Sequence, residues 1–183
     1  MRKGFNVKKV QLKKFLLDST PLIILMGVAI LMRLVPHPPN FTPLIAMGLF
    51  GVVMFKDKRV GFLVPILVML LSDMMLGFHS FMIYVYSALL ISSAVGLWLK
   101  QNMTAVNVVL SSCASATLFF VITNSAVWLT STMYAKTVAG LVTCFTMAIP
   151  FYHNSLIATV LYSSVMFLGI HVFTKRNLVN AKI

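Results

Sequence analysis

The segment Leu34–Leu44 reads LVPHPPNFTPL and separates two runs of almost pure hydrocarbon. It holds four prolines, one histidine and one asparagine. Each proline removes a backbone donor and fixes φ, and it drives the residue before it out of the helical region. The segment therefore predicts a stiff, polar loop between two apolar helices.

The composition on both sides of this loop is that of a polytopic membrane protein. Of 183 residues, 60% are hydrophobic and 10% are charged, whereas soluble domains carry about 25% charged residues. The mean hydropathy is +0.96. The net charge of +12 lies in short clusters between apolar runs, a pattern typical of headgroup attraction and not of nucleic-acid binding. Cys113 and Cys144 lack metal-ligand spacing and are expected to be packing residues.

The apolar runs predict an all-α integral membrane protein with six transmembrane helices plus one re-entrant segment or half-helix. The half-helix is expected at Val138–Phe151, because this run is short and Pro150 stands at its end. The expected segments are Pro21–Val35, Pro43–Phe55, Val60–Leu76, Phe81–Leu99, Ala105–Leu129, Val138–Phe151 and Ser155–Phe173.

The basic residues predict the orientation of these segments. With six crossings and a cytoplasmic N-terminus, the basic clusters fall inside and only Arg33 and Lys136 lie outside. We therefore expect a multi-pass protein of the bacterial inner membrane with both termini in the cytoplasm. Residues 1–18 and 175–183 would be basic cytoplasmic tails, and residues 19–174 a single transmembrane domain.

On this topology the polar residues gather at the non-cytoplasmic face. Asp73 is the most informative, since a charge within the hydrocarbon costs about 2.5–3.5 kcal/mol on insertion scales. It is expected either to contact a ligand or ion, or to pair with Arg33 and join two spans. The expected substrate-binding residues are Arg33, His37, Asn40, Phe41, Asp73, Phe78, His79, Asn124, Trp128, Tyr152 and Asn154.

The prolines suggest what the loop does at this face. A stiff loop covers a cavity with a smaller ordering cost than a flexible one. We therefore predict that LVPHPPNFTPL is the lid or wall of an outward-facing pocket. An aromatic-rich mouth with both charge signs suits a planar, zwitterionic or weakly charged metabolite.

Several stretches resemble a family of small bacterial inner-membrane proteins described as transport proteins of unknown function. The matching stretches are RLVPHPPNFTPLIAMGLFG, VPILVMLLSDMMLGFH, TNSAVW and GLVTCFTMAIPFYHNSL, between Arg33 and Leu156. That family is in turn similar to the substrate-binding S components of energy-coupling-factor vitamin transporters. The resemblance implies a six-helix, S-component-like bundle in which a loop after the first helix covers the substrate pocket.

The expected function is therefore binding and uptake of a small metabolite such as a vitamin or its precursor. There is no P-loop in the sequence, so energy would come from an ion gradient or from an energising membrane partner or ATPase module. Membrane lipids and the substrate are the other expected partners, and no cofactor or nucleic acid is expected.

Three alternatives remain at this point. A divalent transition-metal permease could use His37, Asp73, His79 and His153, because imidazole and carboxylate suit such ions. An enzyme is not expected, since HExxH, GxSxG and a carboxylate pair are all missing from the sequence. A structural or assembly subunit would need no polar convergence, and it would show no cavity beneath the Pro36–Pro43 loop.

Overall fold

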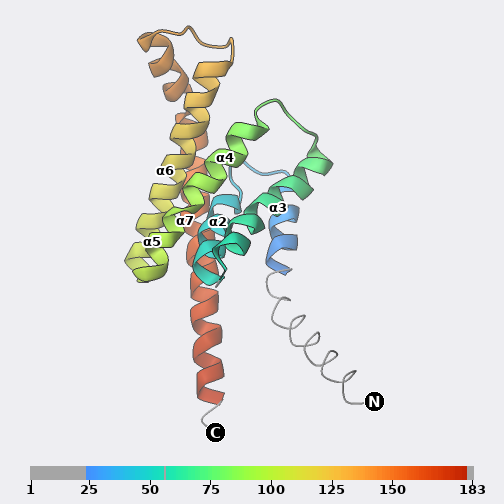
Figure 1. Ribbon diagram of the computed structural model, residues 1–183, viewed down its shortest axis with the longest axis vertical. Coiled ribbons are helices and arrows are strands. Elements are labelled where there is room, and N and C mark those ends of the chain that lie inside the picture. Colours follow the sequence, from blue (N-terminus) through green and yellow to red (C-terminus); the bar gives the residue numbers. More distant parts are fainter. Residues whose placement is uncertain (1–23, 56, 181–183) are drawn as a thin grey trace.

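The computed structural model describes residues 24–180 except residue 56, with side chains up to residue 169. Every regular element in this part of the chain is a helix (Figure 1). The helices are Ile24–Leu34, α2 (Leu44–Met54), α3 (Lys58–Leu76), α4 (Met82–Ser93), α5 (Val95–Gln101), α6 (Ala105–Thr130) and α7 (Val138–Asn180).

Four of these helical stretches are long and apolar enough to cross a membrane. They are α3, the α4–α5 pair, α6 and the first 32 residues of α7. Their positions match the predicted spans Val60–Leu76, Phe81–Leu99 and Ala105–Leu129 to within a few residues. The predicted class of all-helical, membrane-type protein is therefore confirmed.

Successive helical stretches run in opposite directions when α4 and α5 are counted as one, so most connections lie at two ends (Figure 1). We call the end with connections 35–43, 77–81 and 131–137 the loop end, and the end with connections 55–57 and 102–104 the base. At the base, the Asp57 carboxylate accepts a hydrogen bond from the backbone N–H of Arg59 in α3 at 2.9 Å. The Thr104 hydroxyl accepts a hydrogen bond from the backbone N–H of Asn107 in α6 at 3.1 Å. Such side-chain caps satisfy the free donors of a helix N-terminus.

Helix α2 is the centre of the bundle and packs against α3, α4, α5, α6 and α7. It has 11 residues, of which nine are buried. Gly51 of α2 and Gly61 of α3 let the two backbones touch, because a Cβ on either residue would lie 2.6 Å from the other's carbonyl oxygen. Close approach of this kind is the usual role of small residues in membrane helices.

Because α2 is short, the loop before it lies closer to the middle of the molecule than the other connections of the loop end do (Figure 1). Eleven residues rise about 16 Å, roughly half of a hydrocarbon core about 30 Å thick. Connection 35–43 accordingly lies nearer the middle of the molecule than the turn between α3 and α4 does (Figure 1). The proline-rich loop that the sequence predicts therefore lies among the helices.

The predicted break at Pro150 is wrong. Helix α7 runs from Val138 to Asn180 with Pro150 inside it, so the expected half-helix Val138–Phe151 and the span Ser155–Phe173 form one continuous helix. Proline leaves the carbonyl four residues earlier, that of Thr146, without its helical partner. Neighbouring helices and local adjustments commonly offset that loss in membrane proteins, and α6 packs along α7 here.

The predicted tails fall largely at the limits of the described chain. Residues 1–18, and the beginning of the first predicted span, lie outside the described residues. At the other end, α7 continues past the expected boundary at residue 174 to Asn180.

Candidate functional site

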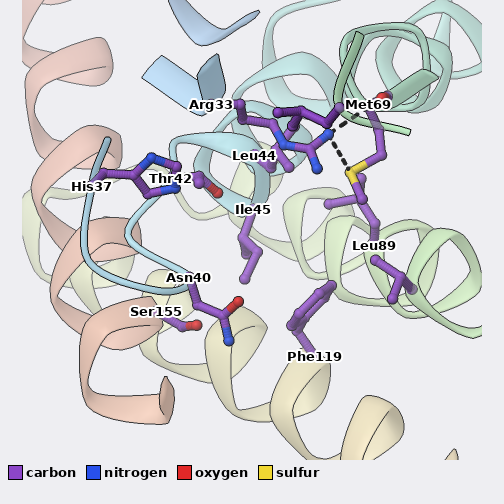
Figure 2. A pocket seen from close by; sticks show the side chains of 12 residues that line it. Arg33, His37, Asn40, Thr42, Leu44, Ile45, Met69, Leu89, Phe119 and Ser155 are labelled. Carbon is purple, nitrogen blue, oxygen red and sulfur yellow. Dashed lines mark hydrogen bonds between the residues drawn. The ribbon is translucent and has the colours of Figure 1, made fainter. Parts of the chain in front are cut away.

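A cavity of about 220 Å³ lies beneath the proline-rich loop. Residues from Ile24–Leu34, the loop, α2, α3, α4, α6 and α7 contribute to its wall (Figure 2). The lining residues are Arg33, His37, Asn40, Thr42, Leu44, Ile45, Met69, Leu76, Val85, Leu89, Phe119 and Ser155.

Arg33 is the one side chain with a fixed charge in this wall. Its Nη2 donates to the Oδ1 of Asp73 at 2.9 Å, and its Nη1 donates to the hydroxyl of Ser72 and to the Met69 carbonyl. The Arg33 side chain is 13% exposed. A guanidinium has five N–H groups, and among the described residues the Nε hydrogen and one Nη2 hydrogen have no acceptor.

Asp73 holds Arg33 in place from behind the cavity wall. Its side chain is 2% exposed, and the hydroxyl of Tyr86 donates to its second oxygen, Oδ2, at 2.9 Å. Both carboxylate oxygens are therefore engaged, and Asp73 is not a lining residue. The ion pair with Arg33, which the sequence left as one of two possibilities, is present and joins Ile24–Leu34 to α3.

The loop is fixed over the cavity by contacts at several points. The amide of Asn154 in α7 donates to the carbonyl of Pro39 at 2.9 Å, and the ring of Phe41 packs edge-on against Tyr162 at 6.0 Å. Asn40 has φ +62°, a left-handed conformation that asparagine tolerates better than most residues. These features define one specific loop conformation.

His37 and Asn40 line the cavity, as the sequence predicted. The Nδ1 of His37 lies 2.7 Å from the Val35 carbonyl, which can only accept, so Nδ1 carries a hydrogen. Asn40 lies beside Ser155 and near Phe119, at the opposite side of the cavity from Arg33 (Figure 2). Ser155 is 4% exposed, and it lines the cavity from α7.

Other predicted site residues lie away from this cavity. Phe78 and His79 are exposed in the turn after α3. Asn124 donates within α6 to the Phe120 carbonyl, and Trp128 donates to the carbonyl of Ala135 in connection 131–137. These four residues are not brought together with Arg33.

Tyr152 is also outside the lining set. Its hydroxyl is 2.9 Å from that of Thr117, and its ring packs against Phe120 with centroids 4.7 Å apart. It therefore belongs to the contact between α6 and α7. Asn154 is close to Tyr152 in sequence, but its side chain hydrogen-bonds to the loop.

The metal site that the sequence allowed is not assembled. Within the described part of the chain, which includes His37, Asp73, His79 and His153, no three His, Cys, Asp or Glu side chains lie close enough to hold a metal ion. The oxygens of Asp73 are occupied by Arg33 and Tyr86, and His79 and His153 are exposed.

Sequence reasoning missed several residues of the site, chiefly Ser72, Tyr86, Phe119 and Ser155. Ser72 and Ser155 directly adjoin two predicted site residues, Asp73 and Asn154. A polar residue next to a predicted polar contact is a signal that could have indicated both serines. Tyr86 and Phe119 lie among other aromatic and apolar residues of their helices, and such positions give no local signal.

Comparison with known proteins identifies the family to which this chain belongs. The arrangement defines a helical membrane-type protein with a cavity beneath its first connection. The chain belongs to the Family of unknown function (DUF6580), whose sequence pattern matches residues 13–181. Searches of curated proteins and of solved structures each found no match.

Proposed function

We propose that this protein binds a small metabolite in the cavity beneath connection 35–43 and serves its uptake across the membrane. The observation that carries the proposal is the cavity itself: about 220 Å³, beneath a stiff loop, with walls from nearly every helix. Apolar walls with a few convergent polar groups are typical of small-molecule sites. A purely structural subunit has no need for such a space.

The size of the cavity limits the ligand. Sites for drug-sized ligands occupy about 300–1,000 Å³, whereas an engineered cavity of about 150 Å³ holds benzene. A volume of 220 Å³ therefore suits a single ring with one or two small substituents. This agrees with the vitamin or vitamin-precursor class that the sequence suggested.

The orientation that we propose follows from charge. Lys58, Arg59 and Lys100 lie at the base, and Lys136 lies at the loop end. By the positive-inside rule the base faces the cytoplasm of a bacterial inner membrane, with both termini on that side. The alternating helices would then make six crossings, with the cavity opening to the non-cytoplasmic face.

The mode of transport is the further part of the proposal. An S-component-like protein binds its substrate and depends on an energising membrane partner or ATPase module, or on an ion gradient. The site holds a fixed cation–carboxylate pair whose groups are bonded to each other, which favours a binding role over catalysis. We therefore propose no chemical step on the ligand.

The test is ligand-dependent stabilisation of the purified protein, with one variant that fills the cavity. Small-molecule extracts of the native cells should raise the melting temperature of the wild type. Val85→Phe should abolish the shift, because Val85 lines the cavity. Ile83→Phe is the matched control, because Ile83 is on the same helix and 69% exposed. A wild type that no fraction stabilises, or an equal shift in Val85→Phe, would contradict the proposal.

A further inference from the structure

The polar groups of the cavity also indicate the chemistry of its ligand, if the proposed binding function holds. They lie mainly in two places. Arg33 is at one side, with His37 and Thr42 nearer to it, and Asn40 and Ser155 are at the other side near Phe119, with Ile45 between (Figure 2). A ligand that uses all of them has a polar group at each end and an apolar middle.

The Arg33 end calls for a hydrogen-bond acceptor. Its Nη1 and one Nη2 hydrogen are bonded to Met69, Ser72 and Asp73. The Nε hydrogen and the second Nη2 hydrogen have no acceptor among the described residues, and Arg33 lines the cavity. A guanidinium has no acceptor atom, so the ligand atom that meets it must be an acceptor such as a carbonyl or carboxylate oxygen.

The net charge of the Arg33–Asp73 pair favours a carbonyl oxygen over a carboxylate oxygen as the ligand's acceptor. Arg33 is already paired with Asp73 at 2.9 Å, and the Asp73 side chain is 2% exposed, so the two formal charges cancel. A carboxylate ligand would bring a second anion to a guanidinium that already has one. Burying a charge without a partner of its own is costly, whereas a carbonyl adds no charge.

The opposite end offers both donors and acceptors. Ser155 is 4% exposed and lines the cavity, and a serine hydroxyl can both donate and accept a hydrogen bond. The side chain of Asn40 lies beside it (Figure 2), and an amide carries two donor hydrogens and an acceptor oxygen. A hydroxyl or an amide-like group on the ligand satisfies these groups.

We infer that the ligand is an uncharged, single-ring compound with a carbonyl acceptor at one end, held by the free edge of Arg33, and a hydroxyl or amide-like group at the other, held by Asn40 and Ser155. Asp73 is a positioning residue in this arrangement. It fixes the guanidinium and cancels its charge, and it does not contact the ligand.

The experiment is a binding titration of the full-length protein in detergent with four related probes. These are 4-hydroxybenzamide, benzamide, 4-hydroxybenzoate and 4-hydroxybenzylamine, each titrated up to about 10 mM because ligands of this size bind weakly. The neutral 4-hydroxybenzamide should bind about tenfold or more tightly than the anion and the cation. Benzamide lacks the second polar group and should bind about fivefold more weakly than 4-hydroxybenzamide.

Variants assign each end of the probe. Ser155→Ala should weaken 4-hydroxybenzamide about fivefold while leaving benzamide unchanged. Ser164→Ala is its matched control, because that hydroxyl is on the same helix and bonds to the Val160 carbonyl. Arg33→Lys keeps the charge but loses the planar fork, and it should weaken both amides. If Arg33→Lys does not fold, the serine pair still tests the inference.

Each result has a definite meaning. Equal or tighter binding of 4-hydroxybenzoate or 4-hydroxybenzylamine overturns the inference of an uncharged ligand, while cavity binding itself stands. Failure of all four probes also overturns it. The proposed function fails separately, when native extracts give no stabilisation that Val85→Phe removes.

Discussion

The two halves of α2 meet their neighbours in opposite ways. At the base, Gly51 approaches Gly61 so closely that a Cβ would lie 2.6 Å from a backbone oxygen. At the loop end, Leu44 and Ile45 of the same helix line a cavity of about 220 Å³. One half is packed backbone to backbone, and the other borders open space.

This difference shows where the molecule can carry function. Small residues at the base let the helices touch and leave no room. At the loop end, Arg33 and the loop residues separate the helices, and their polar groups are held by Asp73, Ser72 and Asn154. The rigid base fixes the walls of the hollow end, which is how a preorganised site is supported.

The largest effect should come from breaking the packed half. In Gly61→Ala the new Cβ would lie 2.6 Å from the Gly51 oxygen and 2.8 Å from the Val52 Cα. Because neither contact is with a movable side chain, we expect a loss of about 3 kcal/mol and a sharp fall in the yield of monodisperse protein. Gly27→Ala is the control, because nothing lies within 4 Å of a Cβ there. Equal yields and melting temperatures for the two variants would contradict the packing account.

The next effect should come from the charge pair behind the cavity. Asp73→Asn leaves the Arg33 charge without its partner, which costs about 3 kcal/mol for a largely buried pair. Thermal unfolding in detergent measures this loss. Arg33→Met combined with Asp73→Leu should recover part of the stability, because both charges are then removed. Asp57→Asn is the control, since Asp57 is exposed and asparagine also caps helices.

A smaller effect should follow from releasing the loop. Asn154→Ala removes the hydrogen bond to the Pro39 carbonyl. One hydrogen bond contributes about 1 kcal/mol, so ligand affinity should fall by up to about fivefold, with a fall of a few degrees in the melting temperature of the free protein. Asn124→Ala removes a bond within α6 and should leave affinity unchanged. An equal loss of affinity in both variants would argue against a fixed loop.

The smallest effect should come from loosening the loop backbone. Pro38→Gly raises the conformational freedom of the open loop, and such changes are worth about 0.4–1 kcal/mol. Ligand binding should weaken about two- to fivefold, as measured by titration. Thr132→Gly loosens connection 131–137 in the same way and should not change binding. Tighter binding in Pro38→Gly would show that the prolines oppose closure.

Much of the helical architecture could be predicted from hydrophobicity alone. The runs that became α3, α4–α5 and α6 are long, apolar and bounded by turn residues, so their limits are close to those observed. The predicted break at Pro150 does not occur, because the cost of a proline in a helix depends on neighbours that the sequence does not show. The short helix α2 matches the predicted segment Pro43–Phe55 to within one residue at each end, and only its central position depends on tertiary contacts that the sequence does not show.

The candidate site could be predicted in outline only. Arg33, His37 and Asn40 were found because polar residues stand out against hydrocarbon, and their position at the loop end followed from the order of the helices. Phe119 and Ser155 line the same cavity, yet an aromatic or a serine within a membrane helix is ordinary. The sequence also predicts Asn124 and Trp128 at that end, but their side chains bond within α6 and to connection 131–137, away from the cavity.

The most direct test of ligand binding in the cavity at the loop end is native mass spectrometry of the protein gently extracted from its own membrane. Wild-type protein should carry a small organic adduct of the size of a substituted ring. The adduct should be absent from Val85→Phe, which fills the cavity, and present in Ile83→Phe, which does not. A wild type without any adduct, or an adduct that persists in Val85→Phe, would contradict the claim that the cavity is a binding site.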